Sequence, residues 1–257
     1  MNKVIHAQEK DTDKIFEFYQ SRYNLLKMAQ ECGFTVKYFE SLSSREKILL
    51  LSHRLREINK TNLASFFYGK LFEVSMDIDS LLCKIDCLIE LSEFDEAIRH
   101  NQTGWEIFLE DYNYDKTLAE NRLCHQKASI LFYTQKYNHS KYICEESIIK
   151  FHTQEFYSLL CANLVAMDMY YDAEKLFSKY SAKFNNSDDF LIDTIVYLLN
   201  DSLNKKTMTF INHIYSMNNY QKIKITDFID KYYSFSHNKS ALKEYFKKEI
   251  IKQNSGS

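Results

Sequence analysis

The chain has 257 residues and a formal net charge of −2, so no global electrostatic field would steer it to nucleic acid or to an anionic membrane. Hydrophobic residues make up 45% and charged residues 26%, an ordinary balance for a soluble globular protein with one long domain or two short ones. With no Pro and only four Gly, the composition argues against a sheet protein with many tight turns and favours helices.

The first predicted element is a long helix near residues 10–32. It ends at Gly33, because glycine readily adopts the left-handed conformation that terminates helices. A short segment, FTVKYFESL, follows. The sequence SSRE from Ser43 to Glu46 then has the pattern of a capping box, which predicts the start of another helix.

Six helical hairpins are predicted after this point, near residues 45–74, 78–109, 117–151, 154–184, 188–217 and 221–252. The chain is therefore predicted to comprise an N-terminal helical segment, an array of hairpins and a disordered tail, at residues 1–43, 44–252 and 253–257. The basic end of the last predicted helix suits the helix dipole and a polar cap on the array better than a nucleic-acid patch, because two glutamates lie beside its lysines.

A repeated pattern supports the hairpins. A small or nearly small residue, here named the anchor, recurs at intervals of 33, 43, 33, 34 and 34 residues, at Ala64, Ala97, Ser140, Ala173, Thr207 and Ala241. Nine residues before the anchors stand Leu55, Leu88, Leu131, Leu164, Leu198 and Tyr232. Twelve residues before them stand Ser52, Ile85, Ala128, Cys161, Ile195 and Ile229. Four residues after them stand Tyr68, Asn101, Cys144, Phe177, Ile211 and Tyr245.

A period near 34 residues accommodates two helices and two short turns. The anchor lies where two helices approach closely, and the leucine nine residues earlier fills the gap between them. One hairpin cannot bury its apolar face, so successive hairpins stack. The predicted fold class is all-α, a right-handed α-solenoid of about six hairpins preceded by an N-terminal helical segment. The alternative is an irregular helical bundle whose period is accidental.

The segment SEFDEAIRHNQTGW resembles the turn and second helix of the tetratricopeptide repeat (TPR) family, and QKYNHSKYICEES and MYYDAEKLFSKY resemble it less closely. The resemblance covers roughly residues 44–252 and implies TPR-like hairpins. The family's proline after the second helix is absent, and its glycine in the first helix is replaced, at best by Ala128 or Cys161. Between Ala97 and Ser140 about ten extra residues, DYNYDKTLAE, form a loop or lengthen a helix.

The resemblance implies a concave face lined by the first helices, which suits a peptide or a partner helix. Its groove offsets fall on His53, Arg56, Asp86, Glu90, Arg122, His125, Gln126, Ser129, Tyr133, Asn163 and Asn200. Arg122 would bind a carboxylate bidentately, and Asn163 and Asn200 would pair with the backbone of an extended peptide. Tyr133 would supply an aromatic shelf, which makes the stretch from Arg122 to Tyr133 the main candidate. The alternative is a plain solvated groove.

Motifs of known chemistry are absent from the sequence. It contains no glycine-rich phosphate loop, no G-x-S-x-G and no H-E-x-x-H. Cys83 and Cys87 lie four residues apart, and with Cys124 and His125 they invite comparison with a metal site. The spacing between the pairs is wrong for a zinc ribbon and cysteine is commonly buried, so core packing is favoured. No catalytic residue, cofactor or metal is predicted, and the chain is not expected to be an enzyme.

A second resemblance concerns the N-terminal segment. MAQECGFTVKYFESL is similar to the helix-turn-helix of AraC-type regulators. The stretch from Phe34 to Tyr38 is one residue shorter than that pattern and lacks the basic residues that would hold phosphates. We therefore favour a helix that ends at Gly33 and a short packed helix after it.

Three functional classes follow. The first is a protein- or peptide-binding scaffold, which includes a secretion chaperone. The second is a peptide-sensing regulator whose order of segments resembles the Rap-type and arbitrium receptors, with residues 1–43 as an effector or dimerisation surface. The third is an enzyme or injected effector with an unrecognised site. A homodimer through a terminal helix is a further expectation.

Localisation is expected to be cytoplasmic. The chain contains no run of about 18 apolar residues, so no membrane span is predicted. Its N-terminus is too polar for a signal peptide, and its six cysteines without a compact framework fit a reducing compartment.

Overall fold

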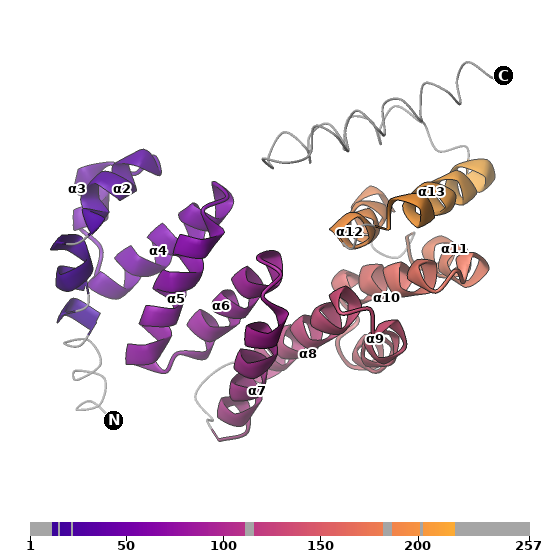
Figure 1. The fold of residues 1–257 in the computed structure, drawn as a ribbon, viewed down its shortest axis with the longest axis horizontal. Helices are drawn as coiled ribbons and strands as arrows, with labels where there is room; N and C mark the ends of the chain where they lie inside the picture. Colours follow the sequence, from indigo (N-terminus) through magenta and orange to yellow (C-terminus); the bar gives the residue numbers. More distant parts are fainter. Residues whose placement is uncertain are drawn as a thin grey trace, which may run out of the picture. The chain divides into compact units, whose positions relative to one another are not determined.

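The computed structural model describes residues 12–14, 16–21, 23–110, 116–181, 187–200 and 203–218, and all regular secondary structure within them is helical (Figure 1). The helices with defined bounds are α2 (Leu25–Glu31), α3 (Val36–Glu40), α4 (Ser44–Glu57), α5 (Thr61–Ser75), α6 (Ile78–Glu90), α7 (Phe94–Glu110), α8 (Lys116–Tyr133), α9 (Tyr137–Phe151), α10 (Gln154–Ala166), α11 (Tyr170–Ser181), α12 (Ser187–Asn200) and α13 (Asn204–Asn218).

Four of the six predicted hairpins are observed as packed pairs of successive helices, α4–α5, α6–α7, α10–α11 and α12–α13. The helices of a further predicted hairpin, α8 and α9, are both present but belong to different compact units. The sixth, predicted at 221–252, lies outside the described residues. The chain divides into two compact units, residues 1–136 and 137–257, which are described separately below. The division falls in the turn between α8 and α9.

The N-terminal segment differs from the prediction of one helix over residues 10–32. Helical turns occur before residue 24, but Asn24 has a left-handed backbone (φ 48°) and interrupts them. Its side chain caps α2 by accepting a hydrogen bond from the backbone N–H of Lys27 at 3.1 Å. Asparagine tolerates this conformation better than most residues, because its short polar side chain bonds locally. The single-helix prediction was wrong at this position.

The predicted stop at Gly33 is confirmed, since this residue has φ +88° and follows the end of α2. The next helix, α3, is short, and its Phe39 is fully buried, as the packed-helix interpretation predicted. The capping box is also confirmed: the Glu46 backbone N–H donates to Ser43 Oγ, while the Glu46 carboxylate accepts from the Ser43 backbone N–H at 2.8 Å.

The repeat register corresponds to burial. Within the described residues every anchor is fully buried: Ala64, Ala97, Ser140, Ala173 and Thr207. The positions nine residues earlier are buried at Leu55, Leu88, Leu164 and Leu198, while Leu131 is half-buried. The positions twelve before and four after the anchors are buried throughout: Ser52, Ile85, Ala128, Cys161, Ile195, Tyr68, Asn101, Cys144, Phe177 and Ile211. The period of about 34 residues is therefore the period of helix packing.

The turns inside the hairpins share one backbone conformation that the sequence did not reveal. The residue five before the anchor has φ near +60° in four repeats, at Asn59, Ser92, Gln135 and Asp168. The next residue's N–H then donates to the carbonyl of the leucine nine before the anchor, as Glu93 does to Leu88 at 2.9 Å. This is the Schellman arrangement, here made without glycine.

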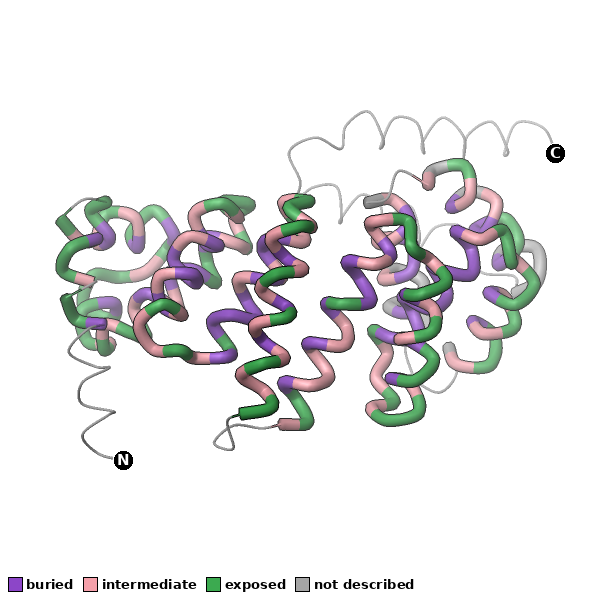
Figure 2. The backbone as a smooth tube through the Cα atoms, turned by 60° about the horizontal axis from the view of Figure 1, so that its bottom comes forward, coloured by how far each residue is buried: buried purple, intermediate pink, exposed green. Residues whose placement is uncertain are grey.

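Unit 1 is built by packing of neighbouring helices: α4 on α5, α5 on α6, α6 on α7 and α8, and α7 on α8. Figure 2 shows buried residues along the faces that these helices turn toward one another. The last five residues of the ten-residue insertion, 116–120, form the start of α8, which is 18 residues long. Gly104 allows α8 to approach α7, because a Cβ there would lie 2.6 Å from Leu123 Cδ2.

Unit 2 is organised around α10, which packs against α9, α11, α12 and α13. All residues of α10 from Phe156 to Ala166 are buried. A helix that is apolar on every side needs neighbours on every side, and here four helices supply them.

Candidate functional site: a polar cluster on the first helices

The first helices of unit 1 carry five polar side chains that contact one another. Asp86 on α6 is their centre, and with Arg56, Glu90, Arg122 and Gln126 it forms what we call the Asp86 cluster. Arg122 Nη2 on α8 lies 2.9 Å from Asp86 Oδ2, and Arg56 Nη1 on α4 lies 3.6 Å from the same oxygen. Gln126 Nε2 donates to Asp86 Oδ1 at 2.6 Å. Side chains from three successive first helices therefore meet at one carboxylate.

Further hydrogen bonds fix the side chains of Arg56 and Gln126 within the cluster. Arg56 donates from Nε and Nη2 to Glu90 Oε1, at 2.9 and 2.6 Å. Gln126 Nε2 also donates to the backbone carbonyl of Leu82 at 2.8 Å, and its side chain is almost fully buried. Arg122, by contrast, remains 29% exposed. Gln126 is thus a buried support, while Arg56, Glu90 and Arg122 face solvent in part.

The two positive charges of the cluster, on Arg56 and Arg122, are balanced by the carboxylates of Asp86 and Glu90. Burial alone would lower the pKa of Arg122, but the charge of Asp86 outweighs it and the pKa is raised. The same competition raises the pKa of Arg56, where the hydrogen bond to Glu90 is the largest favourable contribution. Both guanidinium groups stay charged, and fixed charges of both signs are presented on this face.

His53 lies beside the cluster and accepts or donates a hydrogen bond at Nδ1, 2.7 Å from the hydroxyl of Tyr68. Burial lowers the pKa of His53, and the nearby charges of Arg56 and Arg122 lower it further. The imidazole is therefore neutral at pH 7, and its Nδ1 accepts a hydrogen bond from the Tyr68 hydroxyl when Nε2 carries the ring proton.

The other groove residues predicted on α8 are placed differently. Ser129 is buried, and its hydroxyl has no hydrogen-bond partner among the described residues. The half-buried ring of Tyr133 stacks on Phe94 at 5.9 Å between centroids, so it packs against the preceding hairpin. His125 is half-buried on the same helix. The structure brings Arg122 and Gln126 into the Asp86 cluster, while these three residues have other surroundings.

Asn163 and Asn200 belong to unit 2. Asn163 is fully buried and donates from Nδ2 to Ser140 Oγ at 2.9 Å and to the Leu159 carbonyl at 2.8 Å. Its amide joins α10 to the anchor of α9, so it is not presented to a ligand as the register predicted. Asn200 is the last residue of α12, and its side chain lies outside the described part of the structure.

The paired cysteines of α6 lie in the interior. Cys83 and Cys87 are both buried, and the Sγ of Cys83 accepts a hydrogen bond from Arg122 Nη2 at 3.7 Å. Burial raises the pKa of Cys87 to about 12, so its thiol is protonated at pH 7 and is a poor metal ligand and a poor nucleophile. Within the described residues no three His, Cys, Asp or Glu side chains gather as a metal site would require.

Comparison with known proteins bears on the fold. No family model matches the sequence, and no curated protein matches it. The crystal structure of a tetratricopeptide repeat protein from Parabacteroides merdae aligns over 93% of this chain and 98% of that chain, at 12% sequence identity and a TM-score of 0.53. The chain has a TPR-like fold. The predicted fold class, an all-α solenoid of degenerate TPR-like hairpins, is thereby confirmed.

The TPR-like fold gives the Asp86 cluster its context. The cluster lies on α4, α6 and α8, the first helices of successive hairpins in this fold. Among the helices of the described residues, none combines the length and hydropathy that a membrane span requires.

Proposed function

We propose that this TPR-like chain is a non-enzymatic binding protein that holds a protein or peptide segment on the Asp86 cluster of α4, α6 and α8. The observation that carries the proposal is the hydrogen bonding of the Arg122 guanidinium group. Its Nη2 is engaged by Asp86 and Cys83, while Nε and Nη1 make no hydrogen bond to residues that the structure describes. A partly exposed guanidinium held at one corner leaves its other donors for a ligand carboxylate.

The geometry also supports specificity. Arg122 and Arg56 are fixed by Asp86, so binding an acidic group there costs little side-chain entropy. Glu90 is 43% exposed at the edge of the same cluster and would bind a basic group of the ligand. The surface thus favours a segment that carries both charge signs, in an order set by the spacing of the first helices.

A peptide-sensing regulator and a secretion chaperone are narrower forms of this proposal, because both would use the same face. The partner distinguishes them. A short peptide that raises the melting temperature of the chain supports the regulator, and binding to DNA at low salt supports a regulator that acts on DNA. A folded or secreted protein as partner supports the chaperone or scaffold.

The decisive experiment is affinity purification from the native host followed by mass spectrometry. Wild type is compared with Arg122→Glu, with the milder Arg122→Gln, and with Arg99→Glu, an exposed arginine on α7 that lies outside the cluster. We expect a partner that wild type and Arg99→Glu retain and both Arg122 variants lose. Full retention by folded Arg122→Glu and Arg122→Gln would show that the cluster is not the binding site. Circular dichroism melting confirms that each variant is folded.

A further inference from the structure

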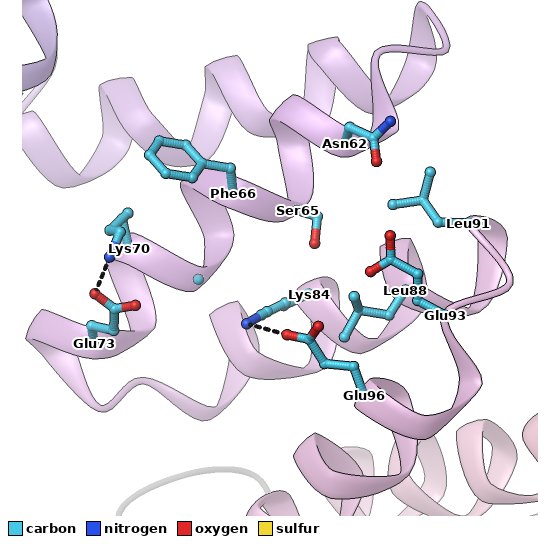
Figure 3. Close-up of a pocket in the computed structure, with 11 residues that line it drawn as sticks. Asn62, Ser65, Phe66, Lys70, Glu73, Lys84, Leu88, Leu91, Glu93 and Glu96 are labelled. Carbon is cyan, nitrogen blue, oxygen red and sulfur yellow. Dashed lines mark hydrogen bonds and ion pairs between the residues drawn. The ribbon is translucent and has the colours of Figure 1, made fainter.

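A cavity in unit 1 lies apart from the Asp86 cluster. It has a volume of about 370 Å³ and is formed by one face of α5, by α6 and by the start of α7. We call it the Ser65 pocket, after the residue at its centre (Figure 3). Leu88 is one of its apolar walls, and its other polar walls are Asn62, Lys70, Glu73, Lys84, Glu93 and Glu96.

The pocket and the cluster use opposite sides of α6. The pocket is lined by Lys84 and Leu88, whereas the cluster uses Asp86 and Glu90. Residues two apart on an α-helix point about 200° apart around its axis. A ligand in the pocket therefore does not touch the cluster, and the two sites can be tested separately.

Ser65 has an unusual environment for a helical serine. Its side chain lines the pocket and the residue is only 7% exposed, yet its hydroxyl has no hydrogen-bond partner among the described residues. Serines elsewhere in these helices donate to the carbonyl four residues earlier, as Ser52 does to Ile48 at 2.6 Å and Ser75 does to Leu71 at 2.7 Å. The Ser65 side chain instead faces the pocket, so its hydroxyl is available to a ligand there.

The charges around the pocket leave one carboxylate unpaired. Lys84 Nζ lies 3.4 Å from Glu96 Oε1, and Lys70 Nζ lies 2.5 Å from Glu73 Oε2. Glu93 forms no ion pair with any residue that the structure describes, although Figure 3 shows its carboxylate beside the opening toward which Ser65 is turned. The lining therefore carries a net charge of −1, located at Glu93.

We propose that the Ser65 pocket binds an arginine side chain of a protein partner. The guanidinium group would donate two hydrogen bonds to the Glu93 carboxylate and one to the Ser65 hydroxyl oxygen, which matches its planar set of donors. Its methylene chain would pack on Leu88. Lys84 does not compete for Glu93, because its ammonium group pairs with Glu96 and its chain packs over Gly69, 3.4 Å from where a Cβ would lie.

The test uses the full chain, methyl-labelled at leucine, titrated with N-acetyl-L-arginine amide while the Leu88 methyl resonances are followed by NMR. N-acetyl-L-citrulline amide is the matched control ligand, since it has the same shape without the charge. We expect saturable shifts with the arginine compound and a dissociation constant about tenfold weaker with the citrulline compound, because the charge-assisted bonds to Glu93 are lost.

Three variants complete the test. Glu93→Gln and Ser65→Ala are expected to weaken binding of the arginine compound about tenfold and about threefold. Glu57→Gln, an exposed substitution on α4, and Arg122→Gln, in the Asp86 cluster, are expected to leave it unchanged. The proposal is overturned by an absence of saturable shifts, by equal binding of the citrulline compound, or by unchanged binding in folded Glu93→Gln. Because Arg122→Gln tests the other face of α6, failure here is distinguishable from failure of the proposed function.

Discussion

Arg122 and Asp86 form an ion pair of 2.9 Å, although 36 residues separate them in the sequence. The distance in sequence is close to one repeat, so the pair joins equivalent helices of neighbouring hairpins. Arg56, one repeat earlier, approaches the same carboxylate oxygen at 3.6 Å. A single side chain therefore connects three repeats, and its removal has consequences for all three.

Replacing Asp86 with Ala should destabilise unit 1 by about 2 kcal/mol, because it leaves two guanidinium groups without their shared counter-charge and Gln126 without one acceptor. Urea unfolding followed by circular dichroism measures this loss. Asp79→Asn, an exposed change on the same helix, is the control and should stay within about 0.5 kcal/mol of wild type. Equal midpoints for wild type and Asp86→Ala would mean that the cluster contributes nothing to stability.

Asn163 permits a direct choice between a surface role and a core role. Because its amide is buried and bonded to Ser140 and Leu159, the isosteric change Asn163→Asp would place an uncompensated charge in the interior. We expect a loss of about 3 kcal/mol or more at pH 7. Chemical denaturation provides the value. Wild-type stability combined with impaired peptide binding would instead support the groove position that the repeat register suggested.

The glycine-free turns predict a stabilising substitution. Gln135 has φ 60°, a conformation that costs most L-residues about 1–2 kcal/mol and costs glycine much less. After allowing for the greater freedom of glycine in the unfolded chain, Gln135→Gly should stabilise the protein by about 0.5–1 kcal/mol. The matched control is Lys127→Gly, an exposed mid-helix change on α8 that should cost about 1 kcal/mol. Thermal melting of the two variants should thus move in opposite directions.

The pKa of His53 and that of His100 are both lowered, chiefly by burial. The unfolded chain therefore binds more protons than the folded chain near pH 6.5, and stability falls as the pH drops through that region. We expect a lower melting temperature at pH 5.5 than at pH 7.5. His53→Gln, which keeps an acceptor for Tyr68, should reduce this difference, and His100→Gln should do the same. A pH dependence that neither variant changes would assign the effect to other groups.

The repeat could be predicted from the sequence because close packing of helices restricts the size of the side chain at certain positions. Ala64, Ala97 and Ala173 lie where two helices approach too closely for larger side chains, and Leu55 and Leu88 fill the adjacent space. Each of these packing constraints limits which residue types fit at one position of the repeat.

The helix interruption at Asn24 was not predicted, because no packing constraint of this kind marks it in the sequence. A helix interruption there depends on one local hydrogen bond to Lys27, and the surrounding sequence favours a continuous helix.

The candidate site was predicted only in part. Three residues at predicted groove offsets, Arg56, Asp86 and Arg122, contact one another in the structure, because the period of a first helix determines which side chains share a direction. The helical register does not predict how deeply the side chains on that face are buried. Asn163 has the offset of a groove residue, but four helices surround α10 and enclose it.

The Ser65 pocket left no pattern in the sequence. Its walls come from α5, α6 and the start of α7, and the space between them depends on how those helices pack. The small residue Gly69 also lines the pocket, with the Lys84 side chain packed over it. A single glycine does not identify a binding site without the neighbouring helices.

The Schellman turns also determine which amides are protected from exchange with solvent. The N–H groups of Glu93 and Lys136 lie in short surface turns, where hydrogen exchange is normally fast, yet each donates to the carbonyl of a leucine in the preceding helix. They open only when the end of that helix unwinds. Their exchange rates would therefore report, one hairpin at a time, the free energy of loosening each repeat.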